Sequence, residues 1–234
     1  MTNLLEASQF FPPVDTADAD GLLGVGGQLT PDWLLDAYRH GIFPWPITGG
    51  VNLLAWWSLD PRAVISWERF HVPRRLWRTC RSGHFTVTCD RDFRGVIEGC
   101  ATASGREGET WLTAEMIAAY VQLFHLGHAH SIEVWCGDAL AGGVYGVGLG
   151  GFFSGESMFH RTTDASKVAL VHLVAYLQSQ GYLFMDIQQL TAHTSRFGAF
   201  EIPREQYLRW LAQALALPVT FGTELVCPRD PPGV

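Results

Sequence analysis

Three polar residues stand in apolar surroundings, where a carboxylate or an amide needs a partner. Glu156 lies in FSGESMF (153–159), directly after the glycine-rich run 142–151. Asp186 and Gln188 lie in the apolar segment YLFMDIQQ (182–189). Buried polar groups are costly unless they are hydrogen-bonded, and glycine lets a backbone approach a ligand closely. The pattern therefore predicts a binding pocket near Glu156.

The spacing within segment 182–189 predicts which side chains act together. Alternation along a strand puts Asp186 and Gln188 on one face, about 7 Å apart at the backbone, and turns Met185 and Ile187 to the other. A carboxylate in so apolar a strand is either a structural hydrogen-bond centre or a working group. The residues themselves leave both interpretations of Asp186 open.

Basic residues concentrate in one part of a chain whose formal net charge is −7. Between Arg62 and Arg94 there are eight arginines against three acidic residues. Four of the arginines recur at helical spacing and would share one helix face: Arg74, Arg75, Arg78 and Arg81. The planar guanidinium suits phosphate oxygens, so this face is either a site for a nucleic-acid backbone or an ordinary solvated surface.

Four tryptophans occur near proline and glycine turns instead of inside long regular segments: Trp45, Trp56, Trp57 and Trp111. A tryptophan at a turn either fills the core or stacks on a base or another flat ring. Together with the arginine face, these residues favour a nucleic acid with an exposed end as the partner.

Two other patterns look like ligand sites and are discounted. His125, His128 and His130 are close in sequence, but Gly127 breaks the helix between them and no cysteine or aspartate follows at metal-ligand spacing. The run GVGLGG (146–151) lacks the strand–helix context of a dinucleotide fingerprint. We expect no metal and no diffusible cofactor.

Composition and cysteine use favour a reducing compartment. The chain of 234 residues is 47% apolar and 12% aromatic, enough for a sizeable core. Its start has no basic region, and no run of about eighteen uncharged apolar residues occurs. Five cysteines without C-x-x-C spacing favour reduced, buried thiols: Cys80, Cys89, Cys100, Cys136 and Cys227. We expect a soluble, cytoplasmic monomer without membrane contact.

Capping and periodicity signals predict the elements that position these residues. Thr30, Pro31 and Gly41 bound a helix over 31–40. Further helices are predicted over 92–101, 113–127 and 166–180, the last two closed by glycine. Strands are predicted over 63–67, 84–89 and 182–188, and three successive strands over 129–159 with a turn at Gly137–Asp138.

This order predicts an α+β fold with helices packed on one sheet. The first part of the chain is rich in turn-forming residues up to about residue 59. We therefore divide the chain into a small N-terminal domain, residues 1–59, and a larger domain, residues 60–234.

Several segments in order resemble one known family over about residues 21–217. They include GLLGVGGQLTPDWLLDAYRHGIFPWP, WWSLDPR, TWLTAEMIAAYVQLFHLGHAHSIEVW, GESMF, ASKVAL and HTSRFGAFEIPREQYLRWL. The chain resembles the leucyl/phenylalanyl-tRNA–protein transferase family. The resemblance implies a small N-terminal domain followed by a GNAT-like, acetyltransferase-type domain with a mixed, largely antiparallel sheet and flanking helices.

The resemblance also implies the substrates and their contacts. The enzyme would move leucine or phenylalanine, with methionine a further candidate, from aminoacyl-tRNA to proteins that begin with arginine or lysine, marking them for N-degron degradation. The arginine face would hold the acceptor stem, and Trp45, Trp111 and Tyr120 the terminal adenosine. The remaining substrate-binding residues would form the aminoacyl pocket: Val144, Phe153, Met158, Leu170, Leu173 and Met185.

The catalytic residues implied by the resemblance are Asp186, Gln188 and Glu156. Asp186 would polarise Gln188, whose amide oxygen accepts a proton from the incoming amine, and Glu156 would lie at the rim. Since an amide oxygen is a weak base, we favour an orienting role. Two alternatives are an acetyltransferase that uses acyl-coenzyme A and a tRNA-binding module without catalysis. The first lacks a glycine loop at RTTDAS (161–166), and the second leaves Asp186 beside Gln188 unexplained.

Overall fold

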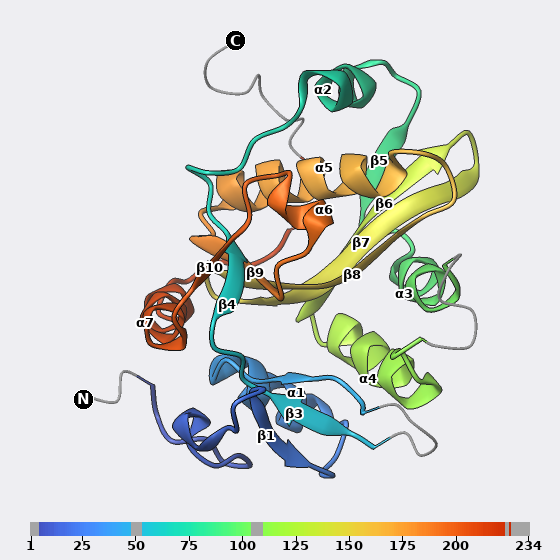
Figure 1. Ribbon diagram of the computed structural model, residues 1–234. Helices are drawn as coiled ribbons and strands as arrows, with labels where there is room; N and C mark the ends of the chain where they lie inside the picture. Colours follow the sequence, from blue (N-terminus) through green and yellow to red (C-terminus); the bar gives the residue numbers. More distant parts are fainter. Residues whose placement is uncertain (1–4, 48–52, 104–109, 223–224, 226–234) are drawn as a thin grey trace.

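Two sheets of different size organise the protein (Figure 1). The computed structural model describes residues 5–47, 53–103, 110–222 and 225. The smaller sheet is antiparallel with strand order β1-β3-β2, from Leu22–Val25 (β1), Phe43–Pro44 (β2) and Ala55–Trp57 (β3). A short 3-10 helix, Val14–Thr16, precedes it.

The larger sheet has strand order β10-β4-β9-β8-β7-β6-β5. Its strands are Arg62–Ile65 (β4), Thr86–Cys89 (β5), Ala129–Cys136 (β6), Ala139–Leu149 (β7), Phe152–His160 (β8), Phe184–Gln188 (β9) and Phe200–Ile202 (β10). All neighbours are antiparallel except β8 and β9, which run parallel. The parallel pairing covers only Phe152–Ser154 opposite Phe184–Asp186, so the rest of β8 leaves its neighbour.

Helices cover both faces of the larger sheet (Figure 1). One face carries α5 (Ala165–Gln180), on which α2 (Arg74–Arg81) packs. The other carries α1 (Pro31–Arg39), α3 (Phe93–Thr102), α4 (Ala114–His125) and α7 (Arg204–Leu215), and the short α6 (Ala192–Ser195) follows β9. No helix among the described residues is long and apolar enough to cross a membrane.

Two apolar clusters form the core, one on each face of the larger sheet. Phe153 and Met185 point to the α5 side, whereas their neighbours Phe152 and Phe184 point to the side of α1, α3, α4 and α7. This division follows from the two-residue period of a strand. β8 and β9 therefore each begin with two apolar residues that are buried on opposite faces of the sheet.

Local capping chemistry explains the helix boundaries. Thr30 accepts a hydrogen bond from the backbone N–H of Trp33, and Thr113 accepts one from that of Met116. α5 ends at Gly181, whose φ of +87° is a left-handed conformation that glycine adopts readily. The predicted helices, the three successive strands and the Gly137–Asp138 turn are confirmed to within two residues at each boundary.

The α+β class, with a small N-terminal sheet and a mixed, largely antiparallel larger one, is confirmed. The division at residues 59 and 60 stays a prediction. The smaller sheet ends at Trp57 and the larger one begins at Arg62. However, one apolar cluster joins Leu34 before this point to Tyr120 and Leu211 after it.

The pairing of β7 with β8 contains a β-bulge. Tyr145 pairs with Ser157, but the next residue, Gly146, pairs with Gly155, so Glu156 is the extra residue. A β-bulge re-aims the side chain that it carries. A Cβ atom at Gly146 would collide with the carbonyl oxygen of Ser154. The glycine at this position therefore lets the bulged strand approach β7.

We predict that Gly146→Ala lowers the free energy of unfolding by about 1–3 kcal/mol, because the backbone must move to admit the methyl group. Gly24→Ala is the control, since a Cβ atom there meets no atom within 4 Å. Urea denaturation midpoints measure both variants. Equal stability of the two would contradict the close approach of β7 and β8.

Candidate active site

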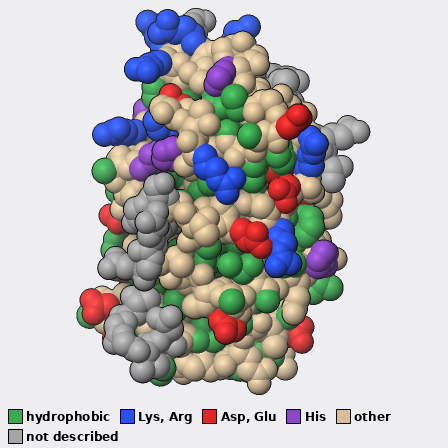
Figure 2. Space-filling view, turned by 90° about the vertical axis from the view of Figure 1, so that its right-hand side faces the viewer, with side chains coloured by type: hydrophobic (Ala, Val, Ile, Leu, Met, Phe, Trp, Pro, Cys, Tyr) green, Lys and Arg blue, Asp and Glu red, His purple; other side chains and the backbone are tan. Residues whose placement is uncertain are grey.

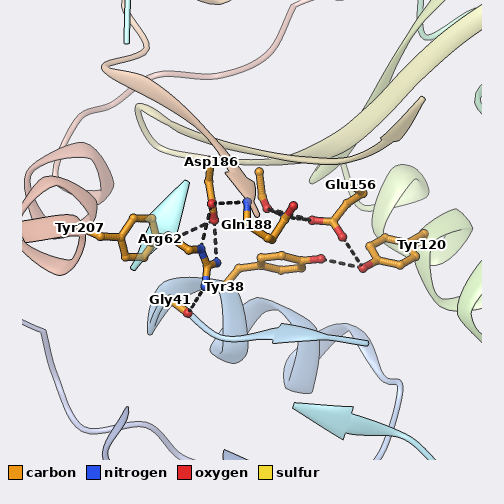
Figure 3. Close-up of polar contacts among 9 residues, drawn as sticks. Tyr38, Gly41, Arg62, Tyr120, Glu156, Asp186, Gln188 and Tyr207 are labelled. Atoms are coloured by element: carbon orange, nitrogen blue, oxygen red, sulfur yellow. Dashed lines mark hydrogen bonds and ion pairs between the residues drawn. The ribbon is translucent and has the colours of Figure 1, made fainter. Parts of the chain in front are cut away.

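Asp186 is the acceptor in a buried ion pair (Figure 3). Its carboxylate accepts hydrogen bonds from Nε and Nη2 of Arg62 at 2.9 and 2.7 Å, and from the hydroxyl of Tyr207 at 2.9 Å. Arg62 is 1% exposed and Asp186 0%. Burial by itself lowers the pKa of Arg62, but the adjacent carboxylate raises it above its ordinary value, so the guanidinium stays charged.

Arg62 also connects β4 to the chain that follows α1. Its Nη1 donates to the carbonyl oxygen of Gly41 at 3.1 Å. The guanidinium lies 4.6 Å from the ring centroid of Phe43 and 4.7 Å from that of Tyr207. Both aromatic rings favour a cation at this distance. The side chain of Arg62 thus connects β4 to the smaller sheet, to β9 and to α7.

Gln188 ends β9 in a left-handed conformation, with φ of +57°. Such a conformation is uncommon for a residue with a side chain and needs compensating contacts. The backbone N–H of Gln188 donates to Oδ1 of Asp186 at 2.9 Å, while Nε2 of its side chain donates to Oγ of Ser154 at 2.8 Å and to Oε1 of Glu156 at 3.2 Å. Asp186 therefore contacts Gln188 through the backbone, and the side-chain amide faces Glu156.

Glu156 is surrounded by hydrogen-bond donors (Figure 3). Oε1 accepts from Oγ of Ser154 at 2.8 Å, and Oε2 accepts from the hydroxyl of Tyr120 at 3.0 Å. Burial raises the pKa of Glu156 to about 7, although these hydrogen bonds act in the opposite direction. A carboxyl group with this pKa can take up and release a proton at neutral pH.

A cleft of about 800 Å³ lies where β8 leaves β9. Glu156 and Gln188 belong to the polar part of its wall. The apolar part comes from β4, β7, β8, α5 and β9: Ile65, Val144, Met158, Leu170, Met185 and Ile187. The volume and the mixture of a few polar groups with apolar walls are typical of small-ligand sites.

Two tryptophans form another part of the cleft wall. Trp45 and Trp111 stack with their ring centroids 5.0 Å apart and an interplanar angle of 17°. Trp45 is 38% exposed, whereas Trp111 is buried. The pair therefore presents an aromatic surface on which a further flat ring can stack.

Basic side chains lie at the cleft and at one end of the molecule. His160, Arg161 and His193 line the cleft. Burial lowers the pKa of His193, and the nearby charges of Lys167 and Arg196 lower it further. In Figure 2, Lys and Arg side chains gather at the upper end of the molecule, the end to which α2 belongs in Figure 1.

The predicted arginine face exists as a helix surface. Arg74, Arg75, Arg78 and Arg81 are all exposed on α2, and Leu76 is the buried residue of this helix. Arg62 belongs to the same basic segment of the sequence, but its burial against Asp186 removes it from the surface. Whether α2 binds tRNA stays a prediction.

Comparison with known proteins identifies the family. The model of the leucyl/phenylalanyl-tRNA protein transferase family matches residues 64–212, and that of its N-terminal domain matches residues 27–60. Leucyl/phenylalanyl-tRNA–protein transferases from Nitratidesulfovibrio vulgaris (strain DP4) and Magnetococcus marinus are 53% and 51% identical to this chain. The matches cover 91% of this chain and 90% and 91% of the two relatives. The chain belongs to the leucyl/phenylalanyl-tRNA–protein transferase family. It is accordingly a transferase.

Solved structures give weaker similarities. A GCN5-related N-acetyltransferase from Kribbella flavida matches with a TM-score of 0.38 at 9% identity, covering 74% of this chain and 61% of its own. L-PGS from Bacillus licheniformis matches with a TM-score of 0.41 at 10% identity, covering 80% and 70%.

The cleft brings together six of the nine substrate-binding residues that the family resemblance implied: Trp45, Trp111, Val144, Met158, Leu170 and Met185. The other three residues do not line the cleft, and their part in substrate binding stays a prediction. Phe153 and Leu173 belong to the core beside α5, where Phe153 packs on Tyr182. Tyr120 is completely buried and offers no free ring face to an adenine.

Sequence reasoning missed Arg62, Tyr207, Tyr38 and Ser154. Arg62 carried a signal, since it begins an otherwise apolar strand and a buried arginine needs an acid. Ser154 lies two residues before Glu156, but the bulge at that point disturbs simple alternation. The hydroxyls of Tyr38 and Tyr207 carried no signal, because aromatic residues on apolar helix faces usually fill the core.

The remaining expectations concern cysteine and histidine. Cys80, Cys89, Cys100 and Cys136 are free thiols, but only Cys100 is fully buried, and Cys227 lies outside the described residues. Nδ1 of His130 lies 2.7 Å from Oδ2 of Asp90. No group of three or more potential metal ligands occurs among the described residues.

We predict that Arg62→Met lowers the free energy of unfolding by about 3–5 kcal/mol, because it leaves Asp186 charged, buried and without its main partner. Arg62→Met combined with Asp186→Leu should recover part of this loss. Arg209→Met is the matched control, since its ion pair with Glu205 is exposed. A loss as small as that of the control in chemical denaturation would refute the buried pair.

Proposed function

We propose that the protein transfers leucine or phenylalanine from aminoacyl-tRNA to proteins that begin with arginine or lysine. Methionine is a further aminoacyl group of the right kind. The product would carry a destabilising N-terminus and enter N-degron degradation in the cytoplasm, and the enzyme would act as a monomer. Family membership supports aminoacyl transfer from tRNA to protein. The observation that carries the proposal is one cleft that joins an apolar pocket, a tryptophan pair and Glu156.

The apolar part of the cleft suits an unbranched or γ-branched side chain. Val144, Leu170 and two methionines, Met158 and Met185, form its wall. Thioether side chains are flexible and fill irregular gaps, so one pocket can accept both leucine and phenylalanine. Valine and isoleucine should bind worse, because their second γ-carbon lies close to the backbone and restricts χ1.

The tRNA would contact two separate surfaces. Trp45 and Trp111 would take the terminal adenosine by stacking, in keeping with the exposed ring of Trp45. The arginines of α2 would neutralise phosphates of the acceptor stem. A protein with a net charge of −7 needs such a local concentration of positive charge to bind tRNA.

The chemistry consists mainly of alignment. An aminoacyl ester is already activated, and an α-amino group with a pKa near 8 is partly unprotonated at neutral pH. Its nitrogen attacks the ester carbonyl carbon, the bond to the ribose oxygen breaks, and one proton passes from the nitrogen to that oxygen. Gln188 would orient the amine through its amide oxygen. Asp186 would hold the left-handed backbone that aims Gln188.

A transfer assay tests the proposal. We expect leucine to pass from leucyl-tRNA to a peptide that begins with arginine or lysine, and not to one that begins with alanine. Gln188→Ala should lower the transfer rate by about 10²-fold because alignment is weakened, while affinity for charged tRNA stays unchanged. Binding without transfer would identify a tRNA-binding module, and use of acetyl-coenzyme A would identify an acetyltransferase.

The arginine face makes a separate prediction. Changing Arg74, Arg75, Arg78 and Arg81 together to glutamine should weaken tRNA binding. The slope of log affinity against log salt should fall by about 0.9 for each phosphate that the protein no longer neutralises. Arg94→Gln with Arg209→Gln is the control, since both arginines are exposed in ion pairs away from α2. An unchanged slope would make the face an ordinary solvated surface.

A further inference from the structure

We propose that Glu156 carries the proton from the attacking amine to the leaving ribose oxygen, and that Tyr120 and Tyr38 are the positioning residues that keep it ready to do so. This inference rests on the proposed function. It assigns the proton transfer to a different residue from Gln188, and it gives two buried tyrosines a role other than binding adenosine.

Glu156 is the acidic residue that the cleft offers for this step. Among the described residues that line the cleft, it is the only aspartate or glutamate. Asp186 lies behind it, 0% exposed and occupied by Arg62, Tyr207 and the backbone of Gln188. The amide oxygen of Gln188 is a far weaker base than a carboxylate. Glu156 is the extra residue of the β-bulge, and a bulge re-aims the side chain that it carries.

While Glu156 is ionised, the number of available protons fixes the direction of the hydrogen bonds around it. A tyrosine hydroxyl has one proton, and that of Tyr120 goes to Oε2 of Glu156 at 3.0 Å. The 2.6 Å contact between the hydroxyls of Tyr38 and Tyr120 must therefore use the proton of Tyr38. The chain runs from Tyr38 through Tyr120 to Glu156 (Figure 3).

Both tyrosines keep their protons at neutral pH. Tyr38 and Tyr120 are almost completely buried, and burial raises the pKa of each well above its ordinary value. Tyr38 comes from α1 and Tyr120 from α4, so the donors are fixed by two packed helices. On the other carboxylate oxygen, Ser154 and Gln188 also donate. The four residues therefore stabilise the ionised form, which is the form that accepts a proton.

Glu156 takes part in both proton transfers of the reaction. As the nitrogen attacks, its proton passes to the carboxylate, and the resulting carboxylic acid gives a proton to the ribose oxygen when the carbon–oxygen bond breaks. Among the described residues, Asp186, Arg62 and the two tyrosines are the charged or titratable groups around Glu156. His160, which ends β8, and Arg161, which follows it, line the same cleft. A pKa of about 7 allows both halves of the shuttle at neutral pH.

Tyr120→Phe tests the inference because it removes one donor and little volume. Loss of a hydrogen bond to the carboxylate raises its pKa, so the ascending limb of the pH–rate profile should move to higher pH. For a rise of about one pKa unit, transfer should fall several-fold at pH 7 and approach the parental rate near pH 9. Tyr38→Phe should move the limb in the same direction.

Two variants complete the experiment. Glu156→Gln should lower the transfer rate by about 10²–10⁴-fold, the range for loss of a positioned acid or base. Tyr182→Phe is the matched control, since Tyr182 is buried on the opposite face and should leave the profile unchanged. The amine of the acceptor peptide titrates identically in all variants, so differences between profiles come from the enzyme.

A spectroscopic measurement separates this inference from the proposed function. The carboxyl stretch of Glu156, identified by its absence in Glu156→Gln, should titrate at higher pH in Tyr120→Phe than in the parent protein without any substrate. An unmoved carboxyl titration, or a rate that falls equally at every pH, would overturn the role of Tyr120. A parental rate in Glu156→Gln would overturn the proton transfer itself. If the parent transfers nothing while the titration moves, the proposed function fails alone.

Discussion

The fold depends on one buried ion pair, between the guanidinium of Arg62 and the carboxylate of Asp186. Burying either charge without the other would cost several kcal/mol of free energy. The fold must therefore bring Arg62 and Asp186 into contact. The guanidinium of Arg62 also donates to the carbonyl oxygen of Gly41, and Asp186 also accepts from the hydroxyl of Tyr207. The pair therefore connects four segments that are distant in the sequence. Hydrophobic burial would tolerate several placements of these segments. The directional contacts of the pair select one.

The pair joins β4 to β9 within the larger sheet, and β9 diverges from β8 directly after Asp186. Pairing stops at Ser154 and Asp186, and the bulge at Glu156 turns β8 in the same region. The cleft thus occupies the one boundary in the larger sheet where the strands run parallel. Gln188 terminates β9 at this boundary, with its backbone held by Asp186 and its side chain in the cleft.

Local signals were enough to predict most elements, because caps such as Thr30 and turns such as Gly137–Asp138 act over a few residues. Strand order was not predictable in this way. Arg62 and Asp186 are 124 residues apart, and no local pattern specifies that β4 lies beside β9. The same limit applies to the site. Polarity in an apolar context pointed to Glu156, Asp186 and Gln188, but their partners became visible only in three dimensions.

The long-range nature of the buried ion pair has a consequence for synthesis of the protein on the ribosome. Trp45 and Arg62 emerge early, Asp186 much later, and Tyr207 near the end of the described chain. Domains form as units once their sequence is available, and non-local pairings form last. A nascent chain that stops before α7 already holds every described residue that lines the cleft, but it lacks the Tyr207 hydroxyl that donates to Asp186. The hydrogen bonds of the Asp186 carboxylate are therefore complete only after α7 has been synthesised.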